Sequence, residues 1–122
     1  MIMTFNDQLL HAIGEWSKDP IEDELLFVKF REQIVNRMST VEAFEAIGET
    51  VDVLISQTDE SNAIEVVQTL IALARQSDTT EIPSKLLSQK IVIESQFSKF
   101  GGYAKNTIQE LFHYYRLWQN FN

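Results

Sequence analysis

The sequence predicts an all-α protein. Apolar residues recur at the three- and four-residue spacing of helices along most of the chain, and the alternation typical of β-strands is missing. Only four glycines and two prolines occur among the 122 residues, so few positions would interrupt a helix. This length and an apolar content of 44% suit one core, and we expect a single all-α domain over residues 1–122.

The first third of the chain divides into two predicted helices. The first covers residues 4–16, and its apolar face consists of Phe5, Leu9, Ile13 and Trp16. The second begins at Asp19, which can cap a helix ahead of Pro20, and runs to about residue 38.

Two further helices are predicted in the middle of the chain. Ser39 followed by Glu42 matches a capping box and predicts a helix that ends near residue 56. Its expected inner face consists of Val41, Phe44, Ile47, Val51 and Leu54. The next helix begins near Ser61 and is apolar around most of its circumference, so we expect it to be the most buried.

Residues 77–80 resemble a linker, after which Pro83 opens a fifth helix that should end at the Gly101-Gly102 pair. A sixth helix is expected over residues 103–119. Paired in order, the six helices form three hairpins, at residues 1–38, 39–76 and 80–120, with a repeat of about 40 residues. Such spacing favours a HEAT-like curl of stacked hairpins, with an irregular six-helix bundle as the competing arrangement.

Charge is distributed unevenly along the chain. Residues 1–81 hold sixteen of the eighteen acids but five of the ten Lys and Arg, a balance of −11. Residues 82–122 hold two acids and five bases, a balance of +3. The acidic part should attract basic partners and repel nucleic acid and anionic lipid. We therefore expect a binder of a basic protein, and neither a nucleic-acid-binding nor a membrane protein.

The compartment is inferred from two sequence features. Without cysteine, the chain has no disulfide framework and no thiolate metal site, which suits a reducing compartment. Its start lacks the basic leader and apolar core of a signal peptide, and no stretch has the ~18 apolar residues of a membrane span. A cytoplasmic location is the expectation.

An acidic series on the third helix is the preferred interaction surface. Its members, spaced three, four and three residues apart, form one stripe. They are Glu42, Glu45, Glu49 and Asp52. Because like charges at these spacings repel, a partner that neutralises them would be favoured. The alternative is an ordinary solvated helix face. Asp59 and Glu60 could extend the patch or serve as turn residues.

Aromatic residues near the C-terminus are the second candidate contact. Tyr114, Tyr115 and Trp118 are of the types that anchor protein interfaces, although packing of a terminal helix onto the core is the favoured explanation for them. Interleaved Lys105 and Arg116 would suit single-stranded nucleic acid, which the net charge of −8 disfavours.

No catalytic constellation is predicted. Glu110 and His113 have the Glu-x-x-His spacing of di-metal bundles, but such a site needs the motif twice, and His11 has Gln8 where the acid would stand. Neither a Gly-x-Ser-x-Gly turn nor a phosphate-binding loop occurs. We expect neither an enzyme nor a protein that depends on a cofactor or a metal.

Three features together resemble a known group: the acidic third helix, the apolar fourth helix, and the closing segment Ile108-Gln-Glu-Leu-Phe-His-Tyr-Tyr-Arg-Leu-Trp118. The chain resembles the small acidic all-α immunity proteins of bacterial contact-dependent inhibition and polymorphic toxin systems, and its closing segment is similar to the end of the helical group called immunity protein 30. The resemblance implies tight binding to one cognate toxin, often a nuclease with a basic active site. A HEAT-like adaptor that binds another basic protein or peptide is the alternative.

Overall fold

The structure, a computed structural model, describes residues 4–18 and 26–117, without the side chains of residues 15–18 and 26. The described residues form α-helices and one short 3₁₀-helix, and they contain no strand. The elements are α1 (Phe5–Lys18), α2 (Leu26–Gln33), η1 (Val35–Arg37), α3 (Thr40–Ile55), α4 (Glu60–Ser77), α5 (Ser84–Ser88), α6 (Lys90–Phe97) and α7 (Gly102–Tyr114). The all-α prediction is confirmed.

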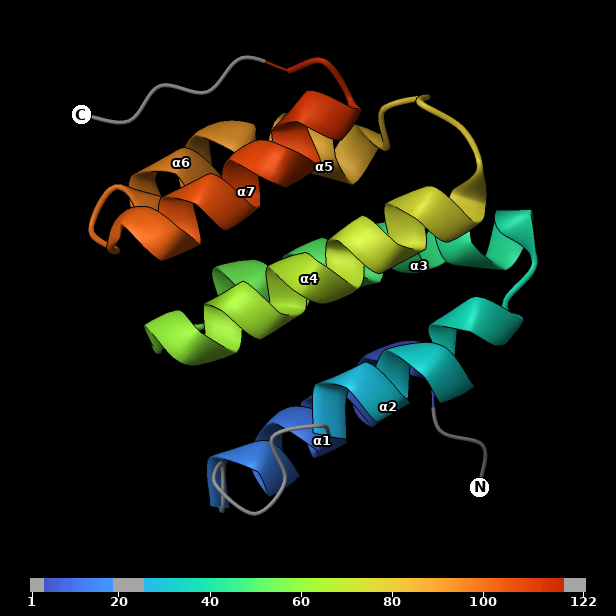
Figure 1. Cartoon of the computed structure of the whole chain (residues 1–122). Coiled ribbons are helices and arrows are strands. Elements are labelled where there is room, and N and C mark those ends of the chain that lie inside the picture. Colours follow the sequence, from blue (N-terminus) through green and yellow to red (C-terminus); the bar gives the residue numbers. More distant parts are fainter. Residues whose placement is uncertain (1–3, 19–25, 118–122) are drawn as a thin grey trace.

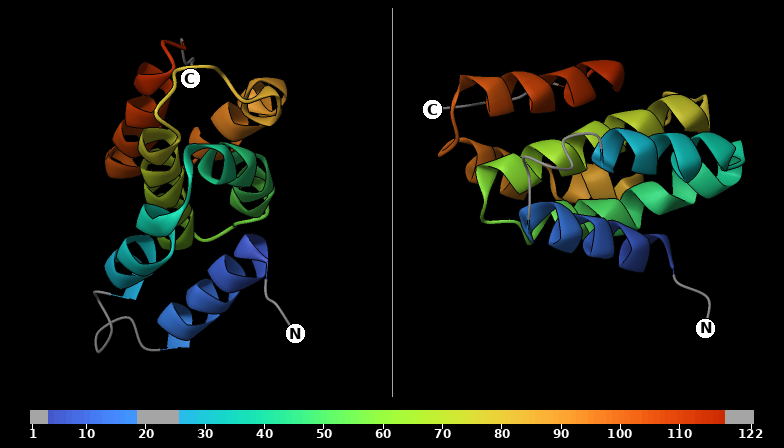
Figure 2. Two further views of the ribbon diagram at one scale, coloured as in Figure 1. Left: turned by 90° about the vertical axis from the view of Figure 1, so that its right-hand side faces the viewer. Right: turned by 60° about the horizontal axis from the view of Figure 1, so that its bottom comes forward.

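The helices form three antiparallel pairs that are stacked on one another (Figure 1). The pairs are α1 with α2, α3 with α4, and the α5–α6 segment with α7. Across the stack, α1 and the α5–α6 segment pack on α3, whereas α2 and α7 pack on α4 (Figure 2). The first helices of the pairs thus make one layer and the second helices make the other, which is the stacked-hairpin arrangement that the repeat spacing predicted.

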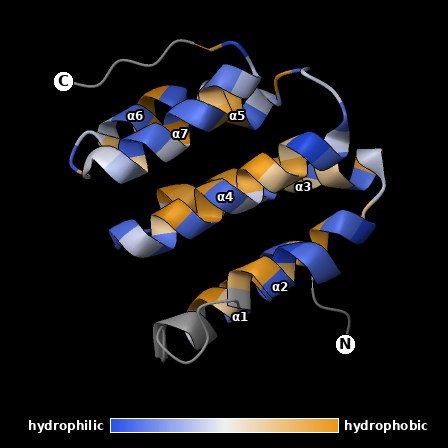
Figure 3. Ribbon diagram, viewed as in Figure 1, coloured by the Kyte–Doolittle hydropathy of each residue, from blue (hydrophilic) through white to orange (hydrophobic). Residues whose placement is uncertain are grey.

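The core is centred on α4, which has a neighbouring helix on several sides. Nine of its residues are buried, and its apolar surface faces the other hairpins (Figure 3). The fully buried apolar residues of this helix are Ala63, Val66, Val67, Leu70, Leu73 and Ala74. This burial confirms the expectation from its nearly all-round apolar sequence.

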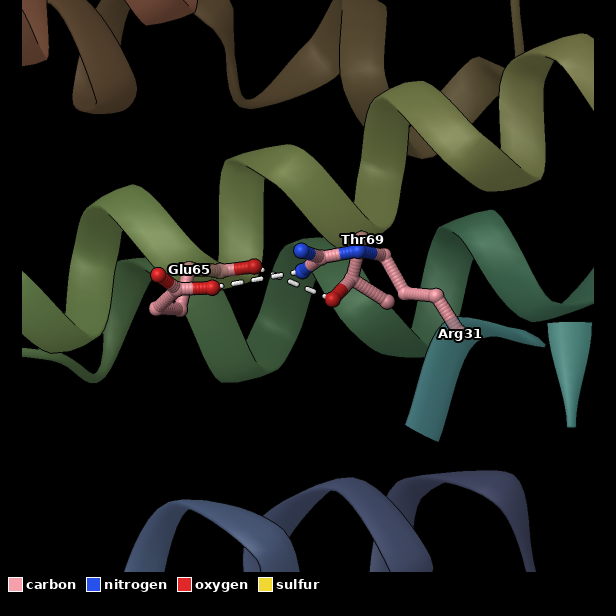
Figure 4. A network of polar contacts seen from close by, with 3 residues as sticks. All are labelled: Arg31, Glu65 and Thr69. Carbon is pink, nitrogen blue, oxygen red and sulfur yellow. Dashed lines mark hydrogen bonds and ion pairs between the residues drawn. The ribbon is translucent and has the colours of Figure 1, made fainter. Parts of the chain in front are cut away.

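A polar contact joins the first hairpin to the second (Figure 4). Arg31 Nη1 on α2 donates to Glu65 Oε2 on α4 at 3.2 Å, and both side chains are largely buried. Thr69 Oγ1, one turn further along α4, donates to the backbone oxygen of Glu65 at 3.0 Å. This ion pair neutralises one base and one acid of residues 1–81, the acidic part of the chain.

Helix boundaries differ from the prediction in the second helix. Its expected start at Asp19 and Pro20 lies outside the described residues. Its α-helical part ends at Gln33, and Val35–Arg37 continues as a 3₁₀-helix. Val35 is fully buried, so the tighter turn places it in the core before the chain enters α3.

The predicted fifth helix is two helices. The α-helical geometry is interrupted at Gln89, whose φ of −102° and ψ of 6° separate α5 from α6. The expected stop at the glycine pair is also wrong, because α6 ends at Phe97 and the glycines begin the next helix. Gly101 is the N-cap of α7 with an extended ψ of 178°, and Gly102 is its first residue.

The last helix ends earlier than residue 119, the predicted end. After Tyr114 the chain forms a Schellman motif, in which the amides of Arg116 and Leu117 donate to the oxygens of His113 and Phe112 at 3.0 and 2.8 Å. Arg116 adopts the left-handed conformation, with φ of 57°, that this motif requires. A position usually held by glycine is thus held by arginine, so no residue type in the local sequence indicates the end of the helix.

Within the described part of the chain, every helix is too short or too polar to cross a bilayer.

Candidate functional site

The capping box at the start of α3 fixes the position of the acidic series. Ser39 Oγ accepts from the Glu42 amide at 3.1 Å, and Glu42 Oε1 accepts from the Ser39 amide at 3.0 Å. These bonds confirm the predicted cap. The hydrogen bond from the Ser39 backbone, and then that from its hydroxyl, hold the pKa of Glu42 below its usual range. Glu42 is therefore ionised at neutral pH.

Three members of the acidic series surround a hollow between α1 and α3. Glu42, Glu45 and Glu49 line it on the α3 side, and its volume is about 220 Å³. The other lining residues are Phe5, Met38 and Ala46. We call this site the acidic hollow. Its wall combines carboxylates with an apolar floor.

In residues 4–14 and 27–117, no basic side chain forms an ion pair with the three glutamates of the acidic hollow. Glu45 and Glu49 are exposed, and among these residues neither forms an ion pair. The apolar floor is held from below, because the ring of Phe5 packs on the ring of Phe30 with centroids 5.7 Å apart. The hollow thus keeps its negative charge over a fixed apolar base.

Val41 lies outside the core. It was predicted on the inner face of α3, but 63% of its surface is exposed. At 100° per residue, Val41 lies about 180° around the helix from the buried Thr50 and about 40° from Glu45. Three predicted inner residues, Ile47, Val51 and Leu54, are buried, whereas Phe44 is half-buried. Val41 therefore lies on the exposed face of α3, and it does not line the acidic hollow.

Asp52 differs from the other three acids. Lys85 on α5 places its Nζ atom 3.0 Å from Asp52 Oδ1, so the carboxylate is neutralised within the chain. Asp52 is also absent from the wall of the acidic hollow. The predicted stripe of four is thus a group of three with available charge and one acid that pairs with the neighbouring hairpin.

Asp59 and Glu60 accept hydrogen bonds from backbone amides at the starts of helices. Asp59 is the N-cap of α4, and its Oδ1 accepts from the Asn62 amide at 2.9 Å. Glu60 Oε1 accepts from the Gly101 amide, which joins the start of α4 to the start of α7. Neither residue lines the acidic hollow.

The predicted aromatic contacts lie in the packed interior. Tyr115 is 3% exposed, and burial raises the pKa of its hydroxyl above the usual range. Tyr114 is half-buried, and its hydroxyl donates to the oxygens of Ala74 and Thr79 at 2.9 and 3.1 Å. Both tyrosines thus help to pack α7 against the core. Trp118 lies outside the described residues.

The Glu-x-x-His pair does not assemble a metal site in the part of the chain that the structure describes. No group of three or more potential ligands occurs there. Glu110 instead pairs with Arg75, with Oε1 3.1 Å from Nη2. This pair joins α7 to α4.

Sequence reasoning found the acids but missed the apolar floor. Helical spacing predicts Phe5 only on the apolar face of its own helix, and it predicts residue 38 only as the end of the second helix. Nothing in the local sequence pairs residues 33 positions apart, and only the packing of α1 on α3 brings them together.

No family model matches the sequence, and neither a curated protein nor a solved structure matches it. Function is therefore inferred from the residues and their geometry.

Proposed function

We propose that this protein is an immunity protein that binds and neutralises a cognate bacterial toxin with a basic surface, such as a nuclease domain, in the cytoplasm. The observation that carries the proposal is the acidic hollow, where Glu42, Glu45 and Glu49 surround an apolar floor and no basic side chain of residues 4–14 and 27–117 forms an ion pair with them.

The hollow suits a lysine or arginine side chain from the partner. Such a side chain has an apolar stem, which can pack on Phe5 and Met38, and a charged head, which the carboxylates can receive. A nuclease active site concentrates basic side chains to hold phosphates, so it offers the complementary surface. Binding there would keep the nucleic acid away from the toxin.

The excess of negative charge supports fast capture. Complementary charge raises association rates above the ~10⁵–10⁶ M⁻¹s⁻¹ of neutral pairs, and this gain falls as salt is added. An inhibitor must reach the toxin before the toxin reaches its substrate, so a high association rate suits this role. The net charge of −8 supplies the long-range attraction.

A second candidate is an adaptor that binds another basic protein or peptide. The stacking of three hairpins in two layers supports it, because stacked helical repeats present extended surfaces to partners. Both candidates use the acidic hollow, and they differ in whether binding abolishes a toxic activity.

Growth rescue separates the two candidates. The immunity proposal predicts a toxin-domain gene immediately upstream of this one. Cells that express this toxin domain should stop growing, and co-expression of the wild-type protein should restore growth. The double variant Glu45→Lys with Glu49→Lys should fail to rescue growth, whereas Asp52→Asn should rescue it. A purified complex without rescue would favour the adaptor, and a missing upstream toxin domain would count heavily against immunity.

A further inference from the structure

The acidic hollow spans the junction between the first hairpin, α1 with α2, and the second hairpin, α3 with α4. Phe5 of its floor comes from α1, and Met38 lies on the segment that joins the two hairpins. The three glutamates of its wall belong to α3. Separation of α1 from α3 would remove Phe5 from the hollow and leave the carboxylates on an open helix surface. A ligand that fills the hollow is therefore bound best while the two hairpins are packed together.

The described part of the first hairpin buries few apolar side chains. Within residues 4–14 and 27–33, the buried side chains are Leu9, Ala12, Ile13 and Phe27. The third hairpin buries eight apolar side chains in residues 82–117, and α4 alone has nine buried residues. Local opening costs more free energy when it exposes more apolar area to water. The first hairpin should therefore open more readily than the other two.

The two helices of the first hairpin are joined to each other by an aromatic contact. The ring of Phe5 on α1 packs on the ring of Phe30 on α2, with centroids 5.7 Å apart and planes tilted by 42°. This contact lies within the first hairpin, so it can persist when that hairpin separates from α3 and α4. We therefore expect α1 and α2 to open together.

The boundary of the opening unit lies at Ile34. The α-helical geometry of α2 ends at Gln33, and Ile34 has φ of −107° and ψ of −58°. Beyond it, Val35 is fully buried, and the Met38 oxygen accepts from Gln76 Nε2 on α4 at 2.6 Å. The segment after Ile34 is thus attached to the second hairpin, whereas the helices before it can leave.

An ion pair in the other layer of the stack favours the packed state (Figure 4). Arg31 Nη1 on α2 lies 3.2 Å from Glu65 Oε2 on α4, and the two side chains are 19% and 26% exposed. Because the hollow lies between α1 and α3, this pair affects it only through the packing of the first hairpin. Loss of one partner would leave a partly buried charge that regains water when the hairpin opens. Arg31 and Glu65 are thus positioning residues for the hollow.

We propose that α1 and α2 open as one unit about Ile34 while the other two hairpins stay folded, and that a basic ligand in the acidic hollow holds this unit closed. The inference rests on the proposed function for the chemistry of the ligand, and it adds a means of regulation. Docking of the first hairpin completes the site, and by reciprocity a ligand in the site stabilises the docked hairpin.

The first test follows native-state amide exchange of the full-length protein by NMR. In the wild type, the amides of α1 and α2 should exchange through an opening that leaves α4 and α7 protected. Arg31→Met, which keeps an apolar stem, should speed the exchange of α1 and α2 about tenfold and leave α7 unchanged. Glu65→Gln should act in the same direction, because it removes the charge from the other side of the ion pair.

Glu110→Gln is the matched control, because it breaks the ion pair that joins Arg75 on α4 to the third hairpin. This variant should leave the exchange of α1 and α2 unchanged. Exchange of α1, α2 and α4 through one global opening in the wild type would overturn the proposal. Equal acceleration of α1 and α7 by Arg31→Met would do the same.

The second test adds hexalysine amide as the probe, at about ten times its measured dissociation constant. Occupation of the hollow should slow the exchange of α1 and α2 by up to about tenfold, because the open unit offers no complete hollow. Glu45→Gln with Glu49→Gln should abolish this slowing. Bound probe that leaves the exchange of α1 and α2 unchanged would overturn the proposal. A probe that does not bind would count against the proposed function, whereas the exchange of the Arg31→Met protein would still decide whether the hairpin opens as a unit.

Discussion

Lys85 Nζ lies 3.0 Å from Asp52 Oδ1, so α5 neutralises the last acid of the series on α3. Both side chains are substantially exposed, and an exposed pair of this kind contributes about 0–1 kcal/mol to stability. Its larger effect is on binding, because it removes Asp52 from the charge that a partner can use. The available charge is thereby concentrated at Glu42, Glu45 and Glu49.

This pairing predicts unequal effects of neutralising the acids. Glu45→Gln and Glu49→Gln should each weaken the binding of the cognate partner by up to about fivefold and reduce its salt dependence. Asp52→Asn should change affinity less than twofold, since its charge is already compensated. Titration calorimetry at two salt concentrations measures both effects. If Asp52→Asn weakens binding as much as Glu45→Gln, the acidic hollow is not the contact.

Loss of the hydroxyl should affect the stability differently at the two adjacent tyrosines. Tyr114→Phe removes bonds to the oxygens of Ala74 and Thr79, and it should lower the free energy of unfolding by about 1 kcal/mol. The Tyr115 hydroxyl is buried without a hydrogen-bond partner in the described residues, so Tyr115→Phe should leave stability unchanged or raise it by about 1 kcal/mol. Urea denaturation compares them directly, and a larger loss at Tyr115 would contradict this assignment.

Arg116 adopts a conformation that glycine adopts more easily. Its φ of 57° lies in the left-handed region at the Schellman position after α7. Arg116→Gly should therefore raise the free energy of unfolding by about 1 kcal/mol. The control is Asn106→Gly, an exposed position inside α7, where glycine should lower stability by a few tenths of a kcal/mol. A destabilising Arg116→Gly would show that the arginine side chain matters more than its backbone.

The capping box predicts that part of the stability of the fold depends on pH in the acidic range. The pKa of Glu42 is lower in the folded chain than in the unfolded chain, because Ser39 donates to its carboxylate. Its contribution is therefore fully present above the unfolded pKa and is lost as pH falls through the folded pKa. Thermal unfolding of Glu42→Gln between pH 7 and pH 3 should show a weaker pH dependence than that of the wild type. An identical pH profile would exclude this contribution.

Helix identities and pairing could be predicted because they follow from local signals. Ser39 and Glu42 mark the start of α3, and the apolar circumference of α4 indicates its central place in the stack. The break at Gln89 could not be predicted, because glutamine is a good helix former and its local sequence contains no stop signal. Both short helices pack on α3, so tertiary contacts set the bend.

The candidate site was predicted only in part for a similar reason. Spacing along one helix placed Glu42, Glu45 and Glu49 together, which their shared hollow confirms. The pairing of Asp52 with Lys85, and the position of Phe5 beneath the acids, depend on contacts between hairpins. The hollow lined by Ile55, Ile91 and Phe100 was not predicted, because helix periodicity alone does not show which apolar residues a neighbouring helix will leave uncovered.

The central hairpin lies between the other two, and this placement has a consequence for recognition. Helices α3 and α4 are held from both sides, so they should open last when amide exchange is followed. The acidic hollow has its carboxylates on this hairpin. A binding surface on the least deformable element loses little conformational entropy when it meets its target. The outer hairpins would thus hold the carboxylates of the acidic hollow in their binding geometry before the partner arrives.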